Sequence, residues 1–259
     1  MKISIITINL NNAEGLKKTI RSVLGQTFRD FEFIIIDGGS TDGSYEIIAE
    51  HAGSLSYWVS EHDNGIYHAM NKGITRASAD YLLFLNSGDY LVNERILAMV
   101  SSRLGVAEIV YGNLRIGGDG SYRDHAYPDR LTFSYFLSYS LGHPAAFIKR
   151  ELFEKVGKYD EGMKICADWA FFIRAVGLFK ASYLHLQETV TVFNTDGISC
   201  MEENRQVMRQ EQDTVLRRDF SFFMTDFESY RDLKDQIEGL RRSKPYKFLK
   251  LLGLPKYQS

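Results

Sequence analysis

The first half of the chain alternates short apolar segments with segments of helical periodicity. Ile3–Ile8, Phe31–Ile36 and Tyr81–Leu85 are apolar runs of strand length, and Glu14–Leu24 places its leucines and isoleucine on one helical face. Apolar strands that alternate with helices are typical of a parallel sheet covered on both faces. We therefore predict an α/β fold with a mostly parallel sheet. The further predicted strands are Leu55–Ser60 and Glu108–Tyr111, and the further predicted helices are 45–48, Ile66–Ile74 and Ile96–Val100.

The second half is less regular and predicts how the chain is divided. Asn113–Tyr127 is rich in glycine, aspartate and tyrosine, which indicates a hairpin or a mobile loop, whereas Asp168–Val176 has the pattern of a helix. From Glu202 the pattern is that of long charged helices. The other predicted strands are Ala145–Lys149, Tyr183–Leu186 and Val190–Asn194. We expect one domain over 1–200, with halves 1–112 and 113–200, and a helical extension with a basic tail over 201–259.

Composition excludes several classes of protein. A formal net charge of −2 gives no overall attraction to nucleic acid. The two cysteines, Cys166 and Cys200, are too few for a disulfide framework or a zinc cluster, which favours a reducing cytosol. The N-terminus reads as a strand and not as a signal peptide, and the longest uncharged stretch, Leu131–Ile148, is too polar for a membrane span. We expect a cytoplasmic protein.

Polar side chains follow each of the first four predicted strands. Strand one ends in Thr7-Ile-Asn9, strand two in Asp37, strand three in residues 61–65 and strand four in residues 86–89. Ligands of open parallel sheets bind beyond the carboxyl ends of the strands, so these side chains predict a pocket at that edge. The turn after strand one has no glycine before Gly15 and the chain has no Gly-Lys-Ser/Thr sequence, which excludes a dinucleotide fingerprint and a P-loop.

Two carboxylates are the candidates for chemistry. Asp89 follows a buried strand and a tight turn, and a single carboxylate suffices for Mg²⁺ when a diphosphate supplies other oxygens. The same turn could instead only cap the next helix. Asp168 opens an apolar helix, where it could be a plain N-cap or a general base at the rim of a cleft. Spacing alone leaves both choices open.

Longer motifs resemble glycosyltransferase family 2, and within it the colanic-acid-type and other bacterial surface-polysaccharide enzymes. The resemblance covers about residues 1–199 and leaves out the segment after Met201. The motifs that carry it, in chain order, are Ser4–Asn9, Gln26–Phe28, Phe31–Ser44, Asp63–Ile74 and Phe84–Asp89.

The resemblance implies a GT-A fold and an inverting transfer from a nucleotide sugar, commonly UDP-linked, with Mg²⁺ or Mn²⁺. The acceptor implied is a saccharide or a polyprenyl-diphosphate-linked saccharide. Asp89 falls on the metal-binding position, Asp168 on the catalytic base, and His143 in a segment near the acceptor. The positions that border the donor are Thr7, Asn9, Asp37, Asn64, Asn71, Lys72, Asn86 and Ser87.

The sequence departs from the family pattern at four positions. Gly38 replaces the second acidic residue after strand two, which opens the choice of base. Asn86 and Gly88 replace acidic residues of the metal motif, so Asp89 has less carboxylate help. Ala167 replaces the glutamate before the base. These changes leave both carboxylates of the mechanism in place.

Two other functions compete with transfer. A nucleotidyltransferase would need a glycine-rich, basic phosphate loop near the N-terminus, and Asn9–Asn12 offers none. A non-catalytic member that binds nucleotide, or acts as a scaffold within a polysaccharide assembly complex, agrees with the thinned metal motif. Retention of Asp89 and Asp168 argues against it.

The C-terminal segment is basic and apolar. After Glu238 no acidic residue follows, and six lysines and arginines alternate with leucines and a phenylalanine. This mixture suits a helix on an anionic membrane surface, at the inner face of the cytoplasmic membrane. A terminal helix packed on the domain or on a partner subunit, as in a homodimer, explains it equally well.

Overall fold

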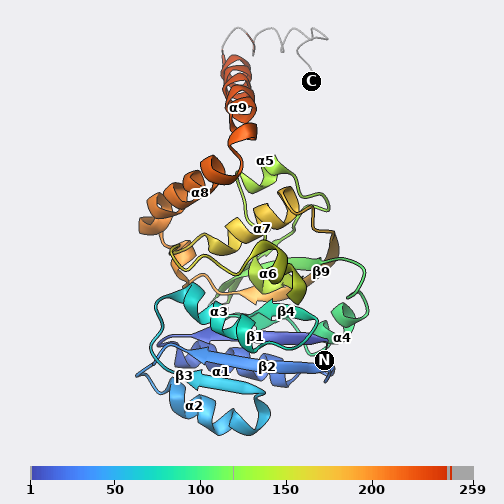
Figure 1. The fold of residues 1–259 in the computed structure, drawn as a ribbon, viewed down its shortest axis with the longest axis vertical. Coiled ribbons are helices and arrows are strands. Elements are labelled where there is room, and N and C mark those ends of the chain that lie inside the picture. The colour runs from blue at the N-terminus through green and yellow to red at the C-terminus, as the bar shows by residue number, and fades with distance from the viewer. Residues whose placement is uncertain (1, 119, 244–245, 247–259) are drawn as a thin grey trace. The chain divides into compact units, whose positions relative to one another are not determined.

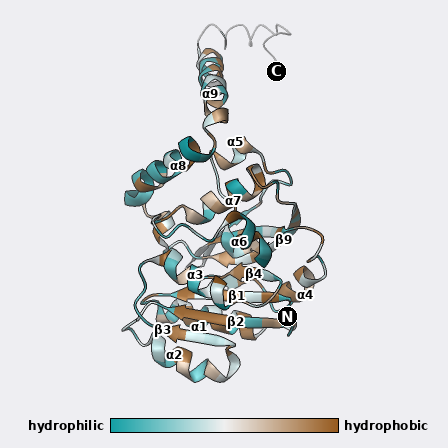
Figure 2. Ribbon diagram, viewed as in Figure 1, coloured by the Kyte–Doolittle hydropathy of each residue, from teal (hydrophilic) through white to brown (hydrophobic). Residues whose placement is uncertain are grey.

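The computed structural model describes residues 2–118, 120–243 and 246. Its sheet is built around β1 (Ile3–Asn9), whose seven residues are all buried, so both faces of this strand are covered. β2 (Phe31–Asp37) and β4 (Tyr81–Phe84) pair with β1 in parallel on either side, and β3 (Tyr57–Ser60) pairs in parallel with β2. Figure 2 shows hydrophobic residues along these central strands. The predicted parallel half is confirmed.

The helices of the first half follow the predicted periodicity closely. α1 (Ala13–Leu24) begins after Asn12, whose side chain accepts a hydrogen bond from Gly15 N as an N-cap. α3 (Ile66–Arg76) packs close to the sheet, because a Cβ added at Gly73 would lie 2.4 Å from Ile6 Cγ2. The remaining helices here are α2 (Ser44–His51) and α4 (Ile96–Ser101).

The second half extends the same sheet with mixed strand directions (Figure 1). Among the described residues the order is β3-β2-β1-β4-β8-β6-β9-β5, and β7 pairs with β6. β8 runs antiparallel to both β4 and β6, while β9 runs parallel to β6. The bounds are β5 (Tyr90–Leu91), β6 (Ile109–Gly118), β7 (Ser121–His125), β8 (Ala146–Lys149) and β9 (Tyr183–Phe193).

Two predicted boundaries in this half are wrong. The strand predicted to end at Tyr111 continues to Gly118, although the hairpin that was one of the two predictions for the following segment does form, between β6 and β7. The two predicted closing strands are one strand, β9, which pairs with β6 across a register shift near Asn113. Long-range pairing with β6 therefore keeps the polar residues in the middle of β9 extended.

Aromatic packing fixes the helix that carries Asp168. Phe171 of α7 (Ala167–Gly177) stacks on Phe153 of α6 (Arg150–Val156) with ring centroids 4.4 Å apart. Tyr159 contacts both of these rings and Phe84 of β4, so α7 is attached to the central sheet. The short helix α5 (Phe133–Phe136) is joined to α7 by a hydrogen bond from Trp169 Nε1 to Phe136 O.

The chain forms two compact units, Met1–Glu211 and Gln212–Ser259. α8 (Arg205–Asp219) begins in the first unit and ends in the second, which also contains α9 (Ser221–Arg242). Within the described residues, no helix combines the length and the apolar character that crossing a membrane requires. Most of the predicted membrane-binding tail, residues 247–259, lies outside the described residues.

Candidate active site

The carboxyl ends of β1, β2 and β4 bring the predicted polar side chains together at one edge of the sheet. Asn9 and Asp37 are register partners in the β1–β2 pair. The turn after β4 is held to β1 because Ser87 N donates to Ile8 O at 3.1 Å. Gly88 in this turn has a φ of +104°, which favours glycine. The turn therefore returns the chain over the sheet edge, and Asp89 follows it.

Asp37 is buried and saturated with hydrogen bonds. Its Oδ1 accepts from Asn9 Nδ2 at 2.7 Å and from Ser40 Oγ at 2.6 Å. Its Oδ2 accepts from Ser60 Oγ at 2.6 Å and from Ser40 N at 3.0 Å. Burial alone would raise the pKa of Asp37, but the hydrogen bonds from Ser40, Ser60 and Asn9 together lower it. Asp37 is thus an ionised carboxylate that organises the loops around it.

Asp89 is equally buried but has few donors. The residue is 4% exposed, and Oδ1 accepts one hydrogen bond, from Asn194 N at 2.8 Å. Burial raises the pKa of Asp89 to about 7, and the Asn194 N–H and His143 oppose this rise. No residue in the described segments donates a hydrogen bond to its Oδ2. A cation beside this carboxylate would offset the cost of its burial.

Asp168 is joined to the turn after β4 through His143. Asp168 Oδ2 lies 3.0 Å from His143 Nδ1, and His143 Nε2 lies 3.2 Å from Asn86 Nδ2. Asp168 Oδ1 accepts from Tyr67 Oη at 3.1 Å. The N-cap of α7 is Cys166, so Asp168 is not the N-cap that one interpretation of its spacing predicted. His143 thus contacts Asp168 directly, and its charge opposes the rise in the pKa of Asp89; we call these three residues the Asp89–His143–Asp168 group.

Several predicted donor ligands are engaged inside the protein. Thr7 is buried and its Oγ1 donates to Leu85 O at 2.7 Å, which joins β1 to the end of β4. Asn71 donates to Tyr159 O and to Glu161 Oε1, each at 2.8 Å, and anchors that loop. Their side chains do not join the Asp89–His143–Asp168 group, and their roles as donor ligands stay predictions.

The other predicted donor ligands lie nearer the surface. Lys72 Nζ lies 2.7 Å from Glu61 Oε1 and 2.6 Å from Asp63 Oδ1. Burial works against its charge, but these two carboxylates raise the pKa of Lys72. Asn64 is exposed, and Ser87 O accepts from Asn12 Nδ2 at 2.9 Å. Lys72 is therefore charged, and Glu61 and Asp63 balance its charge. Because its side chain is partly exposed, a ligand could still reach it.

Three buried oxygens near this edge have no hydrogen-bond partner among the described residues: Asn9 Oδ1, Asp63 Oδ2 and Asn86 Oδ1. Asn86 Oδ1 belongs to the turn that precedes Asp89, and Asn9 Oδ1 lies beside Asp37. An unpaired buried acceptor costs about 1–3 kcal/mol, so such atoms are uncommon in folded proteins. All three are acceptors, which means that a ligand would satisfy them with N–H or O–H groups or with a cation.

The residues at the turn fit a hard divalent cation only in part. Within the described residues, no group of three or more His, Cys, Asp or Glu side chains is placed to hold a metal. The oxygens available at the turn are Asp89 Oδ2 and the unpaired Asn86 Oδ1. Mg²⁺ accepts such a sparse protein set when phosphate oxygens and waters complete its octahedron. A divalent cation at this turn would therefore need a bound phosphate to complete its ligands.

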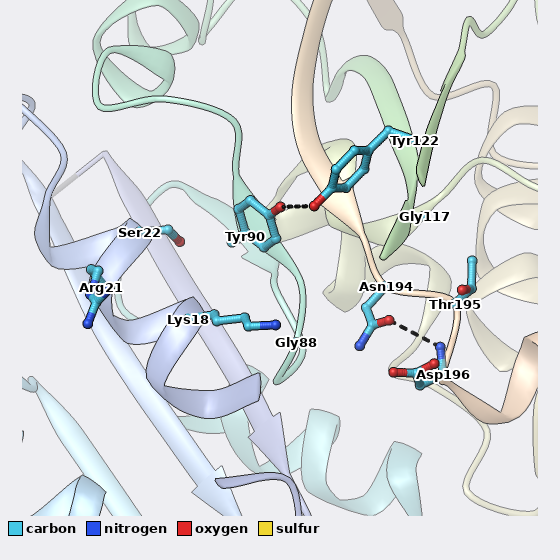
Figure 3. A pocket seen from close by; sticks show the side chains of 10 residues that line it. All are labelled: Lys18, Arg21, Ser22, Gly88, Tyr90, Gly117, Tyr122, Asn194, Thr195 and Asp196. Atoms are coloured by element: carbon cyan, nitrogen blue, oxygen red, sulfur yellow. Dashed lines mark hydrogen bonds between the residues drawn. The ribbon is translucent and has the colours of Figure 1, made fainter. Parts of the chain in front are cut away.

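An open cavity of about 490 Å³ borders this turn (Figure 3). Lys18 and Asn194 face each other across it, and Tyr90 Oη lies 3.2 Å from Tyr122 Oη at another side. Lys18 and Arg21 form no hydrogen bond or ion pair through their side chains in the described part of the chain. The predicted site residues do not line this cavity. It gives positive charge and open space next to Gly88.

Sequence reasoning missed Glu211, which holds the segment before Asp168. Glu211 Oε1 accepts from Lys164 N at 2.6 Å, and Oε2 accepts from Ile165 N at 3.1 Å and Cys166 N at 2.9 Å. One of these donors, Cys166 N, belongs to the N-cap of α7, and the start of a helix favours a carboxylate. These hydrogen bonds join residues 45 to 47 positions apart in the sequence, and no local sequence pattern predicts them.

Comparison with known proteins gives consistent matches. Residues 4–173 match the family described as glycosyl transferase family 2. An uncharacterised glycosyltransferase of Mycobacterium tuberculosis is 36% identical over 181 residues, 67% of this chain and 68% of the relative. A PGL/p-HBAD biosynthesis glycosyltransferase of Mycobacterium bovis is 36% identical over 178 residues, 66% of this chain and 68% of that protein.

Two solved structures share the fold. TarS of S. aureus in complex with UDP-GlcNAc matches with a TM-score of 0.65 and 18% identity over 81% of this chain and 65% of that chain. The mannosyltransferase PcManGT of Pyrobaculum calidifontis in complex with GDP-Man and Mn²⁺ matches with a TM-score of 0.58 and 16% identity over 74% of this chain. The chain spans 65% of the first structure and 56% of the second. The predicted α/β fold of GT-A type is confirmed.

Proposed function

The chain belongs to glycosyl transferase family 2, and on that premise we propose that it is an inverting hexosyltransferase of bacterial polysaccharide biosynthesis. It moves a sugar from a nucleotide-sugar donor to a saccharide or lipid-linked acceptor. The observation that carries the proposal is the chain of contacts from Asp168 through His143 to Asn86, in the turn that precedes Asp89 at the carboxyl edge of the sheet. The relatives described above are mycobacterial glycosyltransferases and not specifically colanic-acid enzymes, so the proposed acceptor carries no narrower assignment than a bacterial saccharide or lipid-linked saccharide.

Asp168 is the proposed general base. Its Oδ2 takes the proton of an acceptor hydroxyl as the hydroxyl oxygen bonds to the anomeric carbon, and the bond from that carbon to the donor diphosphate breaks. The attack from the opposite face inverts the anomeric centre. His143 and Tyr67 contact the two oxygens of Asp168 and hold the carboxylate in one orientation. His143, proposed from the sequence as an acceptor contact, therefore also acts as a positioning residue.

The proposed metal is Mg²⁺ or Mn²⁺, held by Asp89 and Asn86 together with the donor diphosphate. When bound, it offsets the negative charge that grows on the leaving nucleoside diphosphate. The side chains of Lys18 and Arg21 border the cavity next to Gly88 and add positive charge there. PcManGT, which shares the fold, is described in complex with GDP-Man and Mn²⁺.

The proposed donor is a UDP-sugar. TarS, which has the same fold, is described in complexes with UDP and with UDP-GlcNAc. The residues proposed to border the donor are Thr7, Asn9, Asp37, Asn64, Asn71, Lys72, Asn86 and Ser87. Among them, Asn9 and Asn86 support the proposal most directly, because each keeps a buried acceptor oxygen free.

The proposed location is cytoplasmic, with peripheral contact to an anionic membrane or, in a homodimer, to a second subunit. Arg241 and Arg242, which end α9, begin the basic segment, and its later lysines lie outside the described residues. A lipid-linked acceptor would place the enzyme at the inner face of the cytoplasmic membrane. Nucleic acid is not a proposed partner.

Asp168→Asn tests the function. A positioned base contributes about 10²–10⁴-fold to rate, so this variant should lose transfer by that factor while it binds UDP and Mn²⁺ as before. The measurement is nucleotide release from a panel of nucleotide sugars with an acceptor, paired with calorimetric titration. Asp160→Asn, in a loop outside the group, is the matched control. Full turnover in Asp168→Asn would remove Asp168 from the mechanism, and a wild-type protein that binds nucleotide but releases none would be a non-catalytic binder.

A further inference from the structure

Glu211 is a carboxylate of α8 whose two oxygens bind one short backbone segment. Oε1 accepts from Lys164 N at 2.6 Å, and Oε2 accepts from Ile165 N at 3.1 Å and from Cys166 N at 2.9 Å. One turn earlier in α8, Met208 O lies 3.7 Å from Cys166 Sγ. Residues 164–166 are therefore fixed to α8 by hydrogen bonds to a charged acceptor, which are stronger than those between neutral groups.

The same segment leads directly to the proposed base. Cys166 is the N-cap of α7, and Asp168 lies in the first turn of this helix. A second link runs through the buried Tyr67 of α3, whose Oη contacts Ile165 O and lies 3.1 Å from Asp168 Oδ1. A shift of residues 164–166 would therefore move both the start of α7 and the hydroxyl group that contacts the base.

The rest of α7 is attached to the protein by contacts that do not involve α8. Phe171 stacks on Phe153, and Trp169 Nε1 donates to Phe136 O at 2.7 Å. Phe171 and Trp169 are both buried, and both follow Asp168 in the helix. Loss of the contact with α8 should therefore loosen the first turn, which carries Asp168, while the remainder of the helix stays packed.

We propose that Glu211 is a positioning residue for Asp168, which keeps the carboxylate of the base directed at the acceptor hydroxyl. This inference rests on the proposed function. Glu211 need not touch either substrate, because it acts through the backbone of residues 164–166 and through Tyr67. A displacement of about 1 Å can cost about 100-fold in rate, so a small shift at the start of α7 should have a large effect on transfer. The proposed metal ligands lie in the turn after β4, so donor binding should not depend on this contact.

The test compares Glu211→Gln with the wild type. Glutamine keeps the size of the side chain but turns an N–H₂ group toward at least one backbone N–H, so it cannot accept all three hydrogen bonds. The kcat of sugar transfer should fall about 10- to 100-fold, while the calorimetric affinity for UDP in Mn²⁺ stays within about 2-fold of wild type. Glu203→Gln, at an exposed glutamate shortly before α8, removes the same charge and should keep both values.

A double-mutant cycle separates positioning from a general loss of structure. In an Asp168→Asn background there is no base to misplace, so adding Glu211→Gln should lower the residual transfer by less than about 2-fold. An equal loss in both backgrounds would mean that Glu211 only supports the fold, and it would overturn the proposal.

A second variant, Glu211→Asp, covers the case in which glutamine is not tolerated. It keeps the charge but is one methylene shorter, so its kcat should lie between those of the wild type and Glu211→Gln. If neither variant folds in thermal unfolding, or if both transfer sugar at the wild-type rate, the positioning role is overturned while the proposed function stands. Full turnover in Asp168→Asn would instead overturn the proposed base itself, so the two failures are distinguishable.

Discussion

Asp37 and Asp89 are two buried aspartates at the same sheet edge, but they differ in their number of hydrogen-bond donors and in the direction of their pKa shifts. Asp37 accepts four hydrogen bonds, and its pKa is lowered despite its burial. Asp89 accepts one through its side chain, and burial raises its pKa to about 7. Burial alone therefore does not decide the charge of a carboxylate; the number of donors around it does.

The difference supports a structural role for Asp37 and the proposed cation-binding role for Asp89. The hydrogen bonds to Asp37 come from β1, from β3 and from the turn after β2, so its charge joins three parts of the edge. Asp89 is left with too few donors, and Asn86 Oδ1 beside it is also unpaired. The protein itself thus supplies the hydrogen-bond partners of Asp37, whereas Asp89 lacks partners that a cation and a diphosphate would provide.

Asp37→Ala should produce the largest effect. Removal of the carboxylate leaves donors on Asn9, Ser40 and Ser60 unpaired, and at about 1–3 kcal/mol for each such group the free energy of unfolding should fall by about 4 kcal/mol or more. Urea denaturation at pH 7 measures the change. Asp80→Ala, an exposed aspartate before β4, should stay within about 0.5 kcal/mol of wild type. Equal stability of the two variants would contradict the structural role of Asp37.

The pH dependence of stability should have opposite signs at the two aspartates. Asp89 has a folded-state pKa of about 7, above its unfolded value, so its contribution is full at low pH and is lost as the pH rises through 7. Asp37 has a lowered pKa, so its contribution is present above the unfolded value and is lost as the pH falls through the folded one.

Asp89→Asn isolates the first of these slopes. The free energy of unfolding of this variant, relative to that of the wild type, should rise by about 3 kcal/mol between pH 5 and pH 8. Two of these pH units lie below the folded-state pKa of Asp89, and each contributes about 1.4 kcal/mol. Urea titrations of both proteins at pH 5, 6, 7 and 8, without divalent metal, give the difference. A difference that does not change with pH would mean that Asp89 is ionised throughout.

Asp89→Ala should separate binding from stability. Loss of the carboxylate should weaken Mn²⁺-dependent UDP binding by about 100-fold or more, since even changes around metal ligands cost 10–100-fold. Stability at pH 8 should not fall by the amount expected for Asp37→Ala, because only the donor on Asn194 loses its partner. Calorimetric titration with UDP, with and without Mn²⁺, measures the binding, and Asp80→Asn serves as control. Unchanged titration of Asp89→Ala would remove Asp89 from the metal site.

The sequence predicts the strands at this edge because their apolar patterns are local. Ile3–Asn9 and Phe31–Asp37 are continuous runs that end in polar residues, so the meeting of Asn9 and Asp37 follows from a parallel sheet. The hydrogen-bond partner of the Thr7 side chain does not follow from the pattern, because its hydroxyl donates to Leu85 O, 78 residues away. Residue type marks a candidate ligand, but long-range packing decides whether its polar atom is free.

The second half was harder to predict for the same reason. β9 has polar residues in its middle, and only its pairing with β6 shows that it is one strand. The contact of His143 with Asp168 joins a 3₁₀ helix, His143–Ala145, to α7, and nothing in the spacing of 25 residues predicts it. The unpaired oxygen of Asp63 is visible only in three dimensions, because Gly38, which lies near it, follows β2 and is distant in the sequence.

Glu211 sets a practical limit for anyone who shortens this protein. The stretch that identifies the family stops at residue 173, and truncation at residue 200 would keep every residue assigned a role at the sheet edge. Such a fragment would nevertheless lack the Glu211 carboxylate, which accepts hydrogen bonds from the backbone N–H groups of Lys164, Ile165 and Cys166, shortly before Asp168. The shortest fragment that keeps these hydrogen bonds therefore extends through residue 211, beyond residue 173, where the family match ends.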